Sequence, residues 1–118
     1  ITSIPSDLQF GGSLMLRNCE KLRHLPDRLT INGILNATGA RLEKLPQGLK
    51  VTGILFLGEC RMNEIPGDLQ FGDGLYLTGC DVLTKLPGKL HVTGGLSLQG
   101  CLALESLPRV LTVGGEFS

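Results

Sequence analysis

The chain has 118 residues, of which 42% are apolar and 19% are charged, and its formal net charge is zero. Zero net charge and an aromatic content of only 4% argue against nucleic-acid binding, which requires a basic surface and stacking rings. No apolar run approaches the roughly 18 residues of a membrane span, and no signal-peptide pattern is present, so we expect no membrane association.

A repeat of 20–21 residues runs through the whole chain. Its clearest marker is a proline at the same point of each repeat: Pro5, Pro26, Pro46, Pro66, Pro87 and Pro108. Because each repeat must bury its apolar edge against its neighbours, this period predicts a solenoid. The chain begins and ends within repeats. We therefore expect residues 1–118 to form a single repeat domain of five full coils and a partial sixth, taken from a longer array.

Each repeat carries the same expected elements. Short strands are expected, in chain order, at 8–10, 29–31, 49–51, 69–71 and 90–92. After a corner at a glycine, main strands are expected at 14–16, 35–37, 55–57, 75–77 and 96–98. Apolar residues at every second position place one face of each strand inward, and these positions form columns without charged residues. The expected core includes Leu57, and Leu107 and Phe117 in the last repeats.

Four cysteines share one column of the repeat, at Cys19, Cys60, Cys80 and Cys101, and Ala40 fills the remaining coil. No C-x-x-C motif and no nearby histidine accompany them, so we expect no metal site. Adjacent coils would bring their alpha carbons within disulfide range, but side chains stacked in register should point the same way. We therefore expect a ladder of free, buried thiols, which favours a reducing compartment.

No set of residues in the sequence predicts catalysis. His24 and His91 lie in different outward columns, and neither has a serine, cysteine or carboxylate partner at a suitable spacing. Asp68 and Asp73 are separated by the expected strand 69–71, so they do not form the carboxylate pair of a glycosidase. We expect no enzymatic activity, no catalytic residue and no cofactor.

The outward face of the main strands offers a candidate partner-binding surface. Ile34, Ile54, Phe56 and Tyr76 would form one exposed apolar patch at the middle of the sheet, with Met15 and Asn36 beside it. An exposed apolar patch with a polar rim is typical of a protein interface. The alternative is that β-branched and aromatic residues occur here because they favour strands.

The segment Leu96–Leu111, LSLQGCLALESLPRVL, has the pattern L-x-L-x-x-C-x(1–2)-L-x-x-L-P-x-x-L, which resembles a leucine-rich repeat. The L-x-L pair matches the parallel strand of that family, and Cys101 stands where the family places Asn or Cys. The short period and the L-P step are most similar to bacterial leucine-rich repeats, including those of secreted effectors delivered into host cells. The resemblance covers all 118 residues.

The return segment departs from this family, because it alternates L-x-V-x-G and so predicts a strand where many leucine-rich repeats have a helix. Strands on both sides would space neighbouring coils by about 4.8 Å on both faces, which removes the cause of curvature. The expected fold is therefore all-β: a leucine-rich-repeat-like, right-handed parallel β-solenoid with about 20–21 residues per coil, little helix and low curvature.

The resemblance implies a non-catalytic protein-binding scaffold, the recognition domain of a larger bacterial protein such as a secreted effector. Its partner would be another protein, bound on the outer face of the main sheet. The expected location is the bacterial cytoplasm or, for an effector, the host cytoplasm. A structural or self-assembling β-solenoid is the alternative, since uncapped ends would favour end-to-end association. A β-helical carbohydrate-active enzyme has the weakest support.

Overall fold

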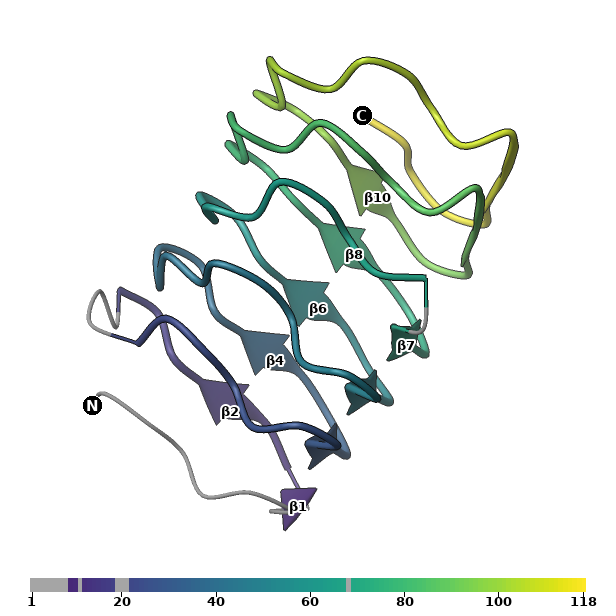
Figure 1. Ribbon diagram of the computed structural model, residues 1–118. Helices are drawn as coiled ribbons and strands as arrows, with labels where there is room; N and C mark the ends of the chain where they lie inside the picture. The colour runs from purple at the N-terminus through teal and green to yellow at the C-terminus, as the bar shows by residue number, and fades with distance from the viewer. Residues whose placement is uncertain (1–8, 11, 19–21, 68) are drawn as a thin grey trace.

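The computed structural model describes residues 9–10, 12–18, 22–67 and 69–118. Figure 1 shows the chain winding into coils that stack in one row, with equivalent segments of neighbouring coils side by side. The described residues contain strands, turns and bends but no helix, and so none that could span a membrane. The predicted all-β parallel solenoid is confirmed.

The main strands form a five-stranded parallel sheet in the order β10-β8-β6-β4-β2. Their bounds are β2 Leu14–Met15, β4 Leu35–Asn36, β6 Leu55–Phe56, β8 Leu75–Tyr76 and β10 Leu96–Ser97. Each strand pairs in register with the equivalent residues of the next coil, as Leu55 does with Leu75. The expected main strands are therefore present, and their order in the sheet follows their order in the chain.

The second side of the solenoid consists of shorter parallel ladders. One sheet has the order β1-β3-β5-β7, and a two-stranded sheet pairs β11 with β9. Their bounds are β1 Gln9–Phe10, β3 Thr30–Ile31, β5 Lys50–Val51, β7 Gln70–Phe71, β9 Lys89–Val92 and β11 Val110–Val113. These elements confirm that the return segment is extended rather than helical.

Backbone hydrogen bonds between coils continue beyond the labelled strands. The N–H groups of Leu55, Leu57 and Glu59 donate to carbonyl oxygens of the following coil over 2.8–3.0 Å. The same pattern recurs in neighbouring coils, so the ladder runs from the main strand into the turn. Since buried backbone groups must find partners, this ladder satisfies the polar groups of a chain that has no helices in its described part.

The glycine corners are required by the close approach of neighbouring coils. A Cβ atom on Gly53 would lie 2.6 Å from the carbonyl oxygen of Gly33, and one on Gly115 would lie 2.8 Å from the carbonyl carbon of Gly94. Neither contact can be accommodated without moving backbone. The exception in this column is Asp73, which is exposed to solvent.

The core consists of the inward columns that the period predicts. Leu22, Leu42, Met62 and Leu83, one from each of four coils, are all at most 1% exposed. Leu57 on the main-strand side is fully buried. Residues of this core come from both sides of the solenoid, and they fill the space between the two sets of strands.

The last repeats depart from the expected core. Leu107 and Phe117 are 51% and 49% exposed, although both belong to columns that are buried in the middle of the stack. Among the described residues, the segment that ends at Ser118 is paired on one side only, with β10. An inward column is therefore buried only where a coil follows. The first residues of the expected core, Ile1, Ile4 and Leu8, lie outside the described residues.

The register of the main sheet can be tested with two adjacent substitutions. We expect Leu57→Ala to lower the free energy of unfolding by about 2–5 kcal/mol, because it leaves a cavity in the core. Phe56→Ala should cost only about 1 kcal/mol, since that ring lies on the outer face and loses mainly one stacking contact. Chemical denaturation of both variants measures the difference, and a larger loss for Phe56→Ala would show that the inward and outward faces are exchanged.

Candidate functional site

The outer face of the main sheet holds the residues predicted as a partner site. Met15 is the most exposed of them, at 58%. Ile34, Ile54, Phe56 and Tyr76 are each partly exposed. These four side chains therefore form a face that is only partly open to solvent. Phe56 and Tyr76 lie on β6 and β8, and Ile34 and Ile54 lie just before β4 and β6.

Phe56 and Tyr76 form the centre of this face. They are directly paired across β6 and β8, and their rings stack with centroids 5.0 Å apart and planes inclined by 15°. An offset stack of two aromatic rings stabilises such a pair by about 0.5–1.5 kcal/mol beyond its buried area. The two rings therefore present one continuous aromatic surface across two coils.

Two glycines provide the space in which the Tyr76 ring lies. A Cβ atom on Gly74 would come within 2.8 Å of Tyr76 Cε2, and one on Gly95 within 2.7 Å of the Tyr76 hydroxyl oxygen. The ring therefore lies across the backbone of its own coil and of the next one. The sequence contains a signal for this arrangement. The positions equivalent to Ile34 and Ile54 in the next two coils are glycines, and the chain's only tyrosine lies between these two glycines in the sequence.

Beside the aromatic pair lies a depression of about 400 Å³. Its lining comes from three coils and includes Thr38, Phe56, Gly58, Glu59, Tyr76, Thr78 and Gly79. Ile34, Asn36, Ile54 and Met15 are not part of it. The structure thus brings Phe56 and Tyr76 together with residues of the turn that follows the main strands.

Two polar side chains of the outer face bond within the protein. Asn36 Oδ1 accepts a hydrogen bond from the N–H of Thr38 at 3.1 Å, which ties the strand end to the turn. Ser97 and Thr78 share a hydrogen bond of 2.8 Å between their hydroxyl oxygens. Ser97 is only 6% exposed although its position faces outward, because its small side chain lies beside the larger ring of Tyr76, with which it is paired.

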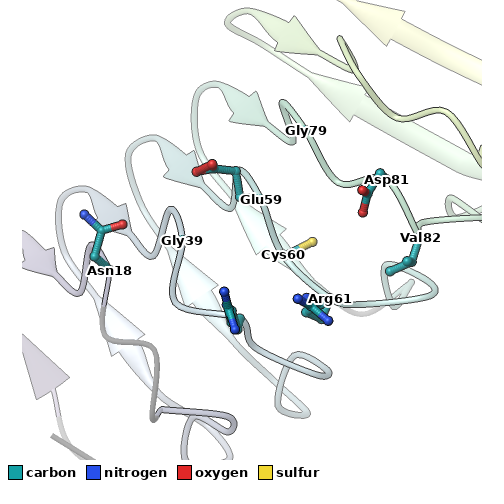
Figure 2. Close-up of a pocket in the computed structure, with 9 residues that line it drawn as sticks. Asn18, Gly39, Glu59, Cys60, Arg61, Gly79, Asp81 and Val82 are labelled. Carbon is teal, nitrogen blue, oxygen red and sulfur yellow. The ribbon is translucent and has the colours of Figure 1, made fainter.

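A second depression, of about 490 Å³, lies at the turn that follows the main strands. Figure 2 shows its lining on the turns of successive coils. Glu59, Cys60 and Arg61 come from one coil, and Gly79 and Asp81 from the next. Sequence analysis did not predict this site, because its residues occur at three consecutive positions of a turn and vary in charge from coil to coil.

The turn has a left-handed backbone at the residue before the cysteine column. The φ angles at this position are 58° in Asn18, 75° in Gly39, 57° in Glu59, 80° in Gly79 and 76° in Gly100. Glycine and asparagine adopt this conformation readily, whereas for glutamate it costs on the order of 1 kcal/mol. The strained residue therefore lies directly before Cys60, at the wall of the second depression.

The cysteine column lies behind this turn. Cys60, Cys80 and Cys101 are free thiols, as predicted, and Cys19 lies outside the described residues. Cys60 and Cys80 are also buried as predicted, but Cys101 is partly exposed, since it lies nearer the end of the stack. The thiols of Cys80 and Cys101 donate hydrogen bonds of 3.1 Å to the main-chain carbonyls of Leu57 and Leu77, one coil earlier. Two thiols of the column thus tie the turn to the backbone of the preceding coil.

The expectation that the stacked thiols point the same way is wrong for one pair. The Cys60 thiol donates to Cys80 Sγ at an S···S distance of 2.8 Å. The Cβ atoms of in-register residues are parallel, but each sulfur can rotate about one bond, so two thiols on adjacent coils can turn towards each other. The hydrogen bond between the two thiols lowers the pKa of Cys60 below its ordinary value, and the same contact together with burial raises the pKa of Cys80.

No group of three or more His, Cys, Asp or Glu side chains that could hold a metal ion occurs among the described residues. Comparisons with protein-family models, with curated proteins and with solved structures each find no match to this chain. The family and the function therefore stay predictions that rest on the repeat pattern and on the two depressions.

The state of the thiols can be measured directly. We expect a bulky aromatic disulfide reagent to titrate four thiols in the denatured, unreduced protein and to react slowly with the native protein, because Cys60 and Cys80 are at most 3% exposed. Absorbance of the released thiolate gives both the number and the rate. Fewer than four thiols after denaturation without reductant would contradict the prediction of a fully reduced column.

Proposed function

We propose that this chain is a non-catalytic protein-binding scaffold that holds its partner on the outer face of the main sheet. The observation that carries this proposal is the Phe56–Tyr76 stack beside a depression of about 400 Å³. Aromatic residues near the centre of a face, next to a hollow that an apolar side chain can fill, are the usual anchors of protein interfaces.

The shape of the site favours a protein partner over a small molecule. The depression is open, and its lining comes from three coils. Ile34 and Ile54, which are partly exposed, lie on the same face of the sheet. A broad face of this kind suits a partner that inserts one apolar side chain and covers the surrounding strands. The threonines Thr38 and Thr78 supply hydroxyl groups at its edge.

The resemblance of the repeat to bacterial leucine-rich repeats supports the same proposal. In that family the sheet of L-x-L strands is the recognition surface, and here the corresponding strands carry the aromatic pair. On this basis we propose that the chain is the recognition domain of a larger bacterial protein, of which secreted effectors are one class.

A self-assembling β-solenoid is the second candidate, and a specific observation favours it. Leu107 and Phe117 are 51% and 49% exposed at the C-terminal end of the stack. An uncovered strand edge with apolar side chains invites pairing with another chain. A second copy stacked on this end would bury these residues without using the aromatic pair.

The binding proposal predicts which substitutions weaken the complex. Proteins retained by the immobilised chain would be purified singly and titrated by calorimetry against the wild type, Phe56→Ala and Tyr76→Ala. We expect either variant to weaken the dissociation constant at least about tenfold, because a central aromatic anchor contributes about 2 kcal/mol or more to binding. The control is Lys50→Ala, an exposed position on β5 of the second side, which should change the constant less than about twofold.

Binding that is unchanged in Phe56→Ala and Tyr76→Ala but lost on substitution of the second side would contradict the proposed surface.

Self-assembly has a separate readout, sedimentation velocity over a wide range of protein concentration. If ends associate, Phe117→Asp should abolish concentration-dependent dimers whereas Phe56→Ala should leave them unchanged, since a charge at the exposed edge opposes stacking. A wild-type monomer that persists to millimolar concentration would contradict the second candidate.

A further inference from the structure

Among the thiols that the structure describes, Cys60 and Cys80 form a close pair. They occupy the same position of adjacent coils, and their sulfurs are 2.8 Å apart. The third described thiol of the column, Cys101, donates to the carbonyl oxygen of Leu77. The column is therefore not a uniform ladder, because two of its sulfurs are in contact while the third bonds to backbone.

The backbone around the pair is compatible with a covalent bond between the two sulfurs. The coils that carry Cys60 and Cys80 are in register, since Phe56 pairs with Tyr76 and the N–H of Glu59 donates to the carbonyl of Thr78 at 2.9 Å. In-register neighbours about 4.8 Å apart fall within the range of alpha-carbon separations found in disulfides. Little movement of the main chain is needed to bring the sulfurs to bonding distance.

The two cysteines differ in their access to solvent. Cys60 forms part of the wall of the second depression, beside Glu59 and Arg61 (Figure 2), whereas Cys80 is fully buried and is not part of that wall. A small oxidant that enters the depression therefore reaches Cys60 first. A bulky reagent is kept away, because only 3% of Cys60 is exposed.

The hydrogen bonds also assign different roles to the two sulfurs. In the neutral pair the Cys60 thiol donates to Cys80 Sγ, and the Cys80 thiol donates to the carbonyl oxygen of Leu57. When Cys60 loses its proton, the Cys80 thiol can donate to the thiolate, and this hydrogen bond lowers the pKa of Cys60. Since the thiolate is the reactive form, Cys60 is the nucleophile of the pair and Cys80 keeps its proton.

We propose that Cys60 and Cys80 form a peroxide-reactive dithiol, with Cys60 as the site of first oxidation and Cys80 as the resolving thiol. The Cys60 thiolate attacks one oxygen of a hydroperoxide, the O–O bond breaks, and the leaving oxygen takes up a proton as water or alcohol. Cys60 is then a sulfenic acid. Cys80 Sγ attacks Cys60 Sγ, the S–O bond breaks, and the hydroxide leaves as water with the proton of Cys80. The two thiols are oxidised by two electrons and the hydroperoxide is reduced by two.

The proposal is independent of what the outer sheet binds, and mass spectrometry tests it on the reduced wild-type chain. On addition of hydrogen peroxide in slight excess, we expect the intact protein to lose two hydrogen atoms and peptide mapping to find one disulfide, Cys60–Cys80. Cys101 should be oxidised at least about tenfold more slowly, because burial raises its pKa and no resolving thiol contacts it. Dithiothreitol should restore the original mass.

Alanine is the appropriate replacement, since Ala40 occupies the same column and is fully buried without loss of the turn. Cys80→Ala should stop the reaction at a sulfenic acid on Cys60, which dimedone traps. Cys60→Ala should give neither the disulfide nor a dimedone adduct at Cys80. Cys101→Ala is the matched control and should form the Cys60–Cys80 disulfide at the wild-type rate.

Three outcomes would overturn the proposal. They are a wild-type protein that keeps its mass under peroxide, a disulfide that maps to Cys80–Cys101 or joins two molecules, and a dimedone adduct on Cys80 in preference to Cys60. Circular dichroism of each variant establishes that it is folded. If Cys80→Ala does not fold, the map of the wild-type disulfide and the comparison with Cys101→Ala still decide between the outcomes.

Discussion

Everything in this structure depends on the in-register parallel pairing of backbone from one coil to the next. A main strand of two residues, such as β6, has no stability by itself, but its ladder continues through the turn and is repeated on both sides. Register fixes which residues lie above one another, so Leu35, Leu55 and Leu75 form a continuous buried column. The period of 20–21 residues in the sequence is the direct consequence of this constraint.

The same register creates both candidate sites. Identical or similar side chains on neighbouring coils lie about 4.8 Å apart, which is close enough for direct contact. On the outer face this brings Phe56 against Tyr76, and in the turn it brings Cys60 towards Cys80. Where the column changes residue type, as at Ala40 in the cysteine column or at Ser97 beside Tyr76, the contact between like side chains ends. The sites are therefore local exceptions within a repeated scaffold, and each is confined to adjacent coils.

Sequence reasoning predicted the fold because strict spacing of apolar residues leaves few alternatives: a leucine at position 57 must face inward if Phe56 faces outward. It could not predict the rotation of the Cys60 and Cys80 sulfurs, since a single side-chain torsion decides whether thiols point in parallel or meet. The left-handed conformation of Glu59 was also missed, because glycine or asparagine at that position of other coils signals the turn but glutamate does not. Leu107 is exposed because its burial depends on a following coil rather than on its own repeat.

The stacking of coils also determines how the molecule responds to mechanical load. The hydrogen bonds between coils run along the direction of the stack. If the two ends are pulled apart in that direction, the force therefore breaks the hydrogen bonds of the end coil first and reaches the next coil only after the end coil has detached. Resistance is then that of a single coil, independent of how many coils are stacked behind it. Each detachment would release a segment of 20–21 residues, or about 70 Å of extended chain, so extension would proceed in even steps at nearly constant force.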